Sequence, residues 1–213
     1  MKGRLFSVLY MFVLSLMFTS VVSALNVLNK DRIRQNEALR VQGLVLNVLN
    51  ISPPEKGSAA ELAQLFSRRV REASLGDRPL YVGLAPDGET VVGYAFPVSG
   101  PGFWGPIDAM VAVDPGIQKI LGIAFYRHSE TPGLGGRITE DWFQNQFRER
   151  PVQVPPAGMR FFYLKPPGTA HAPTELDAIT GATETSRRLE KFLDEELKKT
   201  IPLLLDQKAR SRV

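Results

Sequence analysis

Residues 80–127 read LYVGLAPDGETVVGYAFPVSGPGFWGPIDAMVAVDPGIQKILGIAFYR, and this stretch decides the fold. It contains short runs rich in β-branched and aromatic residues, which favour strands, at 80–85, 90–98, 107–113 and 119–127. The turn sequences Pro86-Asp87-Gly88 and Asp114-Pro115-Gly116 separate neighbouring runs. Because turns this short join only antiparallel strands, the stretch predicts an antiparallel sheet.

Helical patterns lie before and after this predicted sheet. Ser58 and Glu61 have the spacing of a capping box, which predicts a helix at about 59–73. The elements expected after the sheet are a short helix, a strand and a long amphipathic helix, at 140–148, 160–165 and 183–200. Strands grouped together with separate flanking helices indicate the α+β class, an antiparallel sheet with flanking helices.

The N-terminal part of the chain predicts a membrane segment. No charged residue occurs from Leu5 to Asn29, and at about 1.5 Å per residue this stretch could cross a hydrocarbon core of about 30 Å. A cleaved signal peptide is the alternative, since Val22-Ser23-Ala24 offers small residues to a peptidase. The apolar stretch is longer than a signal peptide needs, so we expect one N-terminal transmembrane helix.

A second helix, at about 31–49, is expected to leave the membrane and pack onto the domain, with Ser52-Pro53-Pro54 ending it. Lysine and arginine lie near both ends of the membrane segment, so charge bias leaves its orientation open. The expected organisation is a tail, a membrane anchor, a connecting helix with a linker, a globular domain and a basic tail, at 1–4, 5–29, 30–57, 58–205 and 206–213.

Composition restricts the chemistry. The chain of 213 residues, 44% apolar and 23% charged, is typical of a folded protein. It has no cysteine, which excludes a disulfide framework, an iron–sulfur cluster, a thiolate zinc site and a cysteine nucleophile. Two histidines, His128 and His171, are too few for a histidine-rich metal or haem site, and we predict no metal. The net charge of +4 comes largely from scattered arginines and a basic C-terminal tail, so nucleic-acid binding is not expected.

Two loops could carry a ligand. Residues 177–186, DAITGATETS, open directly into the last predicted helix, whose free N–H groups and dipole suit a phosphate. The alternative is that Thr180 or Thr183 only caps that helix. Residues 128–136, HSETPGLGG, follow the last predicted strand of the sheet, and their glycines would let a flat ligand approach the backbone. An ordinary strand-to-helix connection is the alternative there.

Taken together, the loops resemble a known family. Asp177-x-x-Thr180-Gly181-Ala182-Thr183 resembles the flavinylation motif recognised by periplasmic flavin transferases, and Glu130-Thr131-Pro132-Gly133-Leu134-Gly135 resembles its companion loop. The family is the FMN-binding domain of the Na⁺-translocating NADH:quinone oxidoreductase C subunit and of the Rnf electron-transport complex G subunit. The resemblance covers roughly residues 93–197 and extends to Gly102-Phe103-Trp104-Gly105 and to the N-terminal membrane helix.

The resemblance implies that Thr183 carries FMN as a covalent phosphoester. The residues that the transferase would read, and that would shape the loop, are Asp177, Thr180, Gly181 and Ala182. The residues expected near the isoalloxazine ring or the ribityl chain are Glu130, Thr131, Gly133, Leu134 and Gly135. Thr185 is the rival acceptor, but it lies outside the Gly-Ala-Thr core of the motif.

Single residues leave alternatives open. Trp104 is either a stacking surface for the flavin or a plug in the core. Lys165 either stabilises the phosphate or the reduced flavin, or is solvated. We expect a surface role for His128 and none for His171.

The function that the resemblance implies is electron transfer by covalent FMN in a membrane ion-translocating oxidoreductase complex. The chain offers no general base, nucleophile or metal site, so we expect a redox subunit and not an independent catalyst. Flavinylation outside the cytoplasm would place the domain on the periplasmic face of a bacterial cytoplasmic membrane, with the tail at 1–4 in the cytoplasm. The expected partners are other subunits of the complex, membrane lipid and, during maturation, the flavin transferase.

The type of complex stays open. The short chain favours the Rnf type, whereas Gly102-Phe103-Trp104-Gly105 favours the quinone-reductase type. The alternative function is a stand-alone membrane-anchored flavoprotein that donates electrons to a periplasmic reductase.

Overall fold

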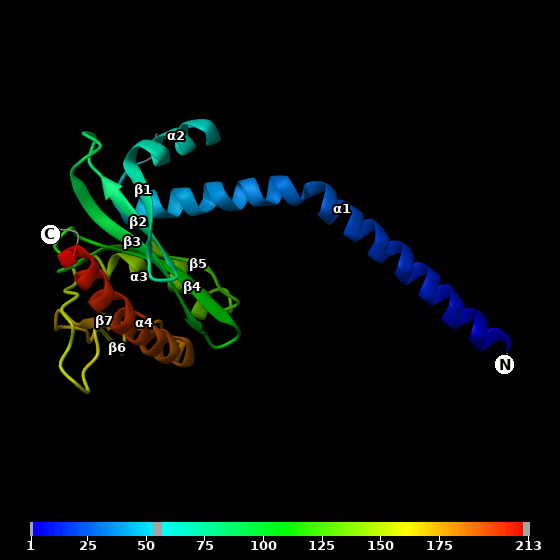
Figure 1. The fold of residues 1–213 in the computed structure, drawn as a ribbon. Helices are drawn as coiled ribbons and strands as arrows, with labels where there is room; N and C mark the ends of the chain where they lie inside the picture. Colours follow the sequence, from blue (N-terminus) through cyan, green and yellow to red (C-terminus); the bar gives the residue numbers. More distant parts are fainter. Residues whose placement is uncertain (1, 53–56, 211–213) are drawn as a thin grey trace. The chain divides into compact units, whose positions relative to one another are not determined.

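The computed structural model describes residues 2–52 and 57–210 and divides into two compact units, Met1–Val41 and Gln42–Val213. The first unit is the greater part of helix α1 (Lys2–Val48), drawn in blue in Figure 1. The part of α1 that begins at Phe6 is long and apolar enough to cross a membrane. The predicted membrane segment at 5–29 and most of the predicted connecting helix therefore belong to one continuous helix.

Helix α1 ends in a hydrogen-bonded cap. Asn50 has a positive φ of 57°, and its N–H donates to the carbonyl of Asn47 at 3.0 Å. The N–H of Ile51 donates to the carbonyl of Leu46 at 2.9 Å, which completes a Schellman motif. The helix thus ends before the predicted stop at Ser52, and Pro53 and Pro54 lie outside the described residues.

A five-stranded antiparallel sheet forms the centre of the second unit, in the order β1-β2-β3-β4-β5. Its strands are β1 (Val70–Leu75), β2 (Arg78–Leu84), β3 (Val91–Pro101), β4 (Pro106–Val113) and β5 (Ile120–Arg127). The predicted antiparallel sheet is confirmed, and its four predicted strands correspond to β2 through β5.

The predicted helix at 59–73 is wrong over its last residues. Helix α2 (Ala59–Arg69) has the predicted capping box, with Ser58 Oγ accepting from the Glu61 N–H at 3.3 Å and the Ser58 N–H donating to Glu61 Oε2 at 2.8 Å. The chain then becomes β1, which pairs with β2 through a two-residue turn opened by Gly76 at φ 61°. Glycine in this position suits a hairpin, and cross-strand pairing overrides the helical pattern.

Different segments cover the two faces of the sheet. Helix α4 (Thr183–Arg210, orange to red in Figure 1) covers one face, where a Cβ on Gly100 would lie 2.3 Å from the Phe192 side chain. On the other face, a Cβ on Gly122 would lie 2.8 Å from the carbonyl oxygen of Val48, at the end of α1. Glycines therefore allow close approach on both faces of the sheet.

The remaining elements lie between the sheet and α4 in sequence. They are the 3₁₀-helix η1 (Gly135–Thr139), helix α3 (Asp141–Asn145), and the parallel pair β6 (Tyr163–Lys165) and β7 (Glu175–Asp177). Helix α3 and strand β6 are shorter than predicted, and β7 was not predicted. Helix α4 runs past the predicted end near residue 200 and through Pro202, because Ile201 and Leu204 continue its buried face.

Candidate functional site

A pocket of about 210 Å³ lies where the β3–β4 turn, the loop after β5 and the start of α4 meet. Antiparallel pairing explains the meeting of the first two segments, because Pro101 pairs with Pro106 and Asp108 pairs with Arg127 at the same end of the sheet. The pocket is lined by Phe103, Trp104, Glu130, Thr131, Leu134, Gly135, Gly181, Ala182, Thr183, Glu184 and Thr185. The fold therefore brings the two loops selected from the sequence into one site.

The carboxylate of Glu130 ties the three segments together. Its Oε1 accepts hydrogen bonds from the N–H groups of Phe103 at 2.7 Å and Trp104 at 3.1 Å. Its Oε2 accepts one from the hydroxyl of Thr185 at 2.6 Å. Glu130 is only 4% exposed, so these contacts are made out of water, where hydrogen bonds to a charged group are strong.

Two glycines make room for this carboxylate. A Cβ on Gly102 would lie 2.5 Å from Glu130 Oε1. A Cβ on Gly135 would lie 2.5 Å from Thr185 Oγ1 and 2.7 Å from Glu130 Oε2. All three distances are too short for a Cβ atom, which explains why glycine occupies these two positions.

Thr183 is the first residue of α4 and is exposed. The carbonyl of the preceding residue, Ala182, accepts the N–H of Ser186 at 3.0 Å, so Ala182 occupies the cap position and Thr183 does not. Among the residues that the structure describes, none forms a hydrogen bond with the Thr183 hydroxyl. Its side chain is free to carry a substituent.

The turn before Thr183 depends on Gly181. Gly181 has a φ of 76°, in the region that glycine adopts most easily, and a Cβ there would lie 3.1 Å from Leu134 Cδ2. Gly181 and Leu134 therefore lie close together, with the loop after β5 beside the loop before α4. The N–H groups of the first turn of α4 have no partner within the helix and lie beside the pocket.

The aromatic residues form an exposed rim. Trp104 is 66% exposed and Phe103 is 46% exposed, with their ring centroids 4.9 Å apart. Trp104 is therefore not a core residue, and its role as a stacking surface stays a prediction. Leu134 adds a further exposed apolar side chain, at 44%.

Other residues singled out from the sequence lie outside the lining of this pocket. Asp177 Oδ1 accepts the N–H groups of Gly168 at 2.8 Å and Ala170 at 3.3 Å, so this side chain holds the loop between β6 and β7. Lys165 lies 3.5 Å from Glu175 in an ion pair on the same two strands. Neither side chain lines the pocket.

The last four residues considered in the sequence also lie outside its lining. His128 Nδ1 accepts the N–H of Glu130 at 3.2 Å, which helps to shape the loop. Gly133 turns the same loop with a φ of 72°. Thr180 and His171 are exposed.

The structure adds residues that the sequence did not single out. Glu184 lines the pocket and forms ion pairs with Arg187 at 2.7 Å and Arg188 at 3.0 Å. Hydrogen bonds from Arg187 and then from Arg188 lower the pKa of the Glu184 carboxyl. The guanidinium of Arg188 also lies 6.0 Å from the ring centroid of Phe103. An acid followed by basic residues three and four positions later favours ion pairs on a helix, and this spacing in the sequence could have indicated the pairs of Glu184 with Arg187 and Arg188.

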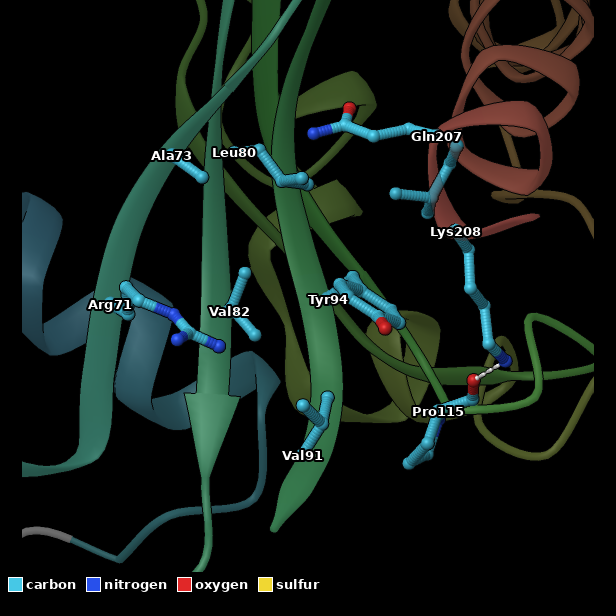
Figure 2. A pocket seen from close by; sticks show the side chains of 10 residues that line it. Arg71, Ala73, Leu80, Val82, Val91, Tyr94, Pro115, Gln207 and Lys208 are labelled. Carbon is cyan, nitrogen blue, oxygen red and sulfur yellow. Dashed lines mark hydrogen bonds between the residues drawn. The ribbon is translucent and has the colours of Figure 1, made fainter. Parts of the chain in front are cut away.

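A larger pocket, of about 480 Å³, lies between β1–β3 and the C-terminal end of α4 (Figure 2). Figure 2 shows Arg71, Tyr94 and Lys208 around it, with the Lys208 ammonium donating to the carbonyl of Pro115. None of the residues selected from the sequence lines it. We place the candidate site in the smaller pocket, because the two sequence motifs meet there.

Comparison with known proteins agrees with this choice. Residues 102–198 match the family model described as FMN-binding domain. The chain is similar to the C subunit of the Na⁺-translocating NADH-quinone reductase of Chlamydia pneumoniae, with 35% identity over 106 residues that cover 48% of this chain and 30% of that protein. It is also similar to the G subunit of the proton-translocating ferredoxin:NAD⁺ oxidoreductase complex of Clostridium ljungdahlii, with 30% identity over 111 residues that cover 52% and 55%.

The chain thus spans from about a third to about half the length of these curated relatives. Among solved structures, NqrC of Shewanella oneidensis shares the fold, with a TM-score of 0.69 and 18% identity over 83% of this chain and 98% of that chain. The C subunit of the Na⁺-translocating NADH-quinone reductase from Parabacteroides distasonis has a TM-score of 0.67 and 23% identity over 82% and 96%. The residues that match the FMN-binding domain model contain the β3–β4 turn, the loop after β5 and the start of α4, so the part of the chain that is similar to this family is the part that forms the candidate site.

Proposed function

We propose that this chain is a membrane-anchored electron-transfer flavoprotein that carries FMN as a phosphoester on Thr183. The observation that carries the proposal is the pocket in which the loop after β5 and the 177–183 loop meet, beside an exposed threonine hydroxyl without a partner among the described residues. Attachment would form a bond between the Thr183 oxygen and the flavin-side phosphorus of a flavin dinucleotide and break the diphosphate bond of that dinucleotide, with release of a nucleoside monophosphate and of the hydroxyl proton. The product is the protein plus FMN minus water.

Burial favours Thr183 over the neighbouring threonines. Thr185 is only 3% exposed, and its hydroxyl is engaged with Glu130. Thr180 is exposed but does not line the pocket. Thr183 combines exposure with a place in the pocket, and its position at the start of α4 puts an attached phosphate at the positive end of the helix dipole.

The residues present fit a flavin nucleotide. The pocket volume of about 210 Å³ lies below the roughly 300–1,000 Å³ of pockets that enclose whole ligands. The pocket therefore suits the phosphate end, while Phe103, Trp104 and Leu134 offer an exposed apolar surface for the ring. When bound, FMN supplies the capacity to accept and release one or two electrons.

We propose further that the chain serves as a subunit of a membrane ion-translocating oxidoreductase complex. Its relatives bear the names of such subunits, and α1 is long and apolar enough to act as a single-pass anchor in a bacterial cytoplasmic membrane. In this arrangement the domain at 58–205 lies on the periplasmic face, where a flavin transferase would modify it, and the tail at 1–4 lies in the cytoplasm. The other partners would be neighbouring subunits and membrane lipid.

The attachment is tested by intact mass of the full chain produced with and without a flavin transferase. We expect a mass increase of one FMN minus water only with the transferase, its loss in Thr183→Val, and its retention in the matched variant Thr183→Ser, which keeps a hydroxyl at the same position. An increment that persists in Thr183→Val, or that never appears with the transferase, contradicts the proposal.

The assembly is tested by copurification of the chain from its native membrane. Subunits of an ion-translocating complex in the purified material would support the proposed role and would show which type of complex it is. Recovery of the flavinylated chain alone would favour the stand-alone electron donor instead.

A further inference from the structure

Glu130 differs from the other buried acids among the residues that the structure describes. Asp108 pairs with Arg127, and Asp194 pairs with Lys198 at 2.8 Å. Glu196 pairs with Arg78 at 2.5 Å and with Lys199 at 2.9 Å. Glu130 is 4% exposed, and among the described residues it has no cationic partner. Buried carboxylates are normally paired with a cation, so an unpaired one inside a ligand pocket calls for an explanation.

The architecture of the turn does not require this negative charge. The Phe103 and Trp104 N–H groups need only an acceptor, which a glutamine side-chain oxygen would supply equally well. The Thr185 hydroxyl can reverse its role and accept a hydrogen bond from a glutamine NH₂ group. A neutral residue of the same shape could thus make all three contacts.

We propose that the charge of Glu130 lowers the reduction potential of the flavin bound in this pocket, an inference that rests on the proposed function. Full reduction adds two electrons to the flavin, and when fewer than two protons from solvent accompany them, the flavin gains negative charge. A fixed carboxylate shielded from water opposes that gain by Coulomb repulsion. Glu184 lines the same pocket, but Arg187 and Arg188 neutralise it and its side chain is 33% exposed, so its influence is smaller.

The test is a redox titration of the flavinylated full chain in lipid nanodiscs, with dithionite as reductant and an indicator dye. Intact mass first establishes that each sample carries the flavin. Glu130→Gln is expected to raise the equilibrium constant for two-electron reduction at least tenfold, which is about 30 mV. The matched control Glu184→Gln is expected to give a smaller shift that falls as salt is added, whereas the Glu130→Gln shift persists because the site is buried.

A second variant separates charge from position. Glu130→Asp keeps the charge on a shorter side chain, so its potential should stay closer to that of the unchanged protein. Equal shifts in the aspartate and glutamine variants, or no rise in Glu130→Gln, would overturn the inference while the flavin attachment stands. Failure of Glu130→Gln to fold would also overturn it, because the charge would then be needed for the turn. Absence of flavin from the unchanged protein would instead refute the proposed function.

Discussion

At the scale of single residues, the site depends on close packing around the carboxylate of Glu130. The carboxylate of Glu130 receives donors from the β3–β4 turn and from α4, and Gly102 and Gly135 lie against it. Close packing of this kind transmits a small change in one side chain to all the segments that it joins. The position of Thr183 therefore depends on residues that need not touch a ligand.

A methyl group at Gly135 tests this dependence. In Gly135→Ala the new carbon would lie 2.5 Å from Thr185 Oγ1, so either the hydrogen bond to Glu130 breaks or the loop shifts. We expect a loss of about 1–3 kcal/mol in the free energy of unfolding, the usual range for overpacking, together with slower flavin attachment. Chemical denaturation and the time course of the mass increment measure the two effects.

Gly133→Ala is the matched control for that variant. Gly133 lies two residues earlier in the same loop, and a Cβ there meets nothing within 4 Å, although its φ of 72° disfavours alanine. We expect backbone strain of about 1 kcal/mol without interference at Glu130. If both variants slow flavin attachment equally, packing against Glu130 is not the cause.

At the scale of secondary-structure elements, an ion pair links α4 to the β1–β2 hairpin. Glu196 lies on the buried face of α4 and pairs with Arg78 of β2 at 2.5 Å and with Lys199 at 2.9 Å. Burial alone would raise the pKa of the Glu196 carboxyl, but the hydrogen bonds from Arg78 and Lys199 outweigh it, and the pKa is lowered. The link therefore couples the stability of the fold to pH.

The direction of this coupling follows from the lowered pKa. The contribution of Glu196 is fully present above the pKa of an unfolded glutamate, about 4.3, and is lost as the pH falls through the lower folded value. We expect Glu196→Gln to reduce the free energy of unfolding by about 1 kcal/mol near pH 7, since the pair is partly exposed. Denaturation between neutral and acidic pH should show the two proteins converging at the acidic end, and a constant difference would contradict the assignment.

The elements also show what the sequence could reveal. Strands β2 through β5 and the capping box at Ser58 follow from local patterns, and both were predicted. Strand β1 was not, because four of its six residues are exposed and its pairing with β2 arises only in the folded chain. The family resemblance selected Glu130 for the site. It could not reveal the hydrogen bond between Glu130 and Thr185, because these residues lie 55 positions apart in the sequence.

At the scale of the whole molecule, the chain has two units of different character. Residues 42–213 contain the sheet, its covering helices and a core of their own, whereas the apolar side chains of α1 between Phe6 and Leu28 are exposed. Exposed apolar surface of this extent is unfavourable in water and favourable in a lipid bilayer. The first unit is thus suited to lipid and the second to water.

A truncated chain tests that division. We expect the full chain to stay in the membrane fraction after an alkaline wash and residues 42–213 to be soluble, with a cooperative thermal transition. The physical reason is that truncation removes the exposed apolar residues and leaves the core of the second unit in place. Aggregation of the truncated chain, or release of the full chain by the wash, would contradict this division.

The exposed rim of the pocket has a consequence for long-range electron movement. The probability of electron tunnelling falls exponentially with the gap between donor and acceptor. A ring resting on Phe103 and Trp104, 46% and 66% exposed, would have little polypeptide between itself and an approaching redox centre. The same openness would admit dioxygen. A shape that speeds electron exchange with a partner would therefore also allow electrons to leak to air.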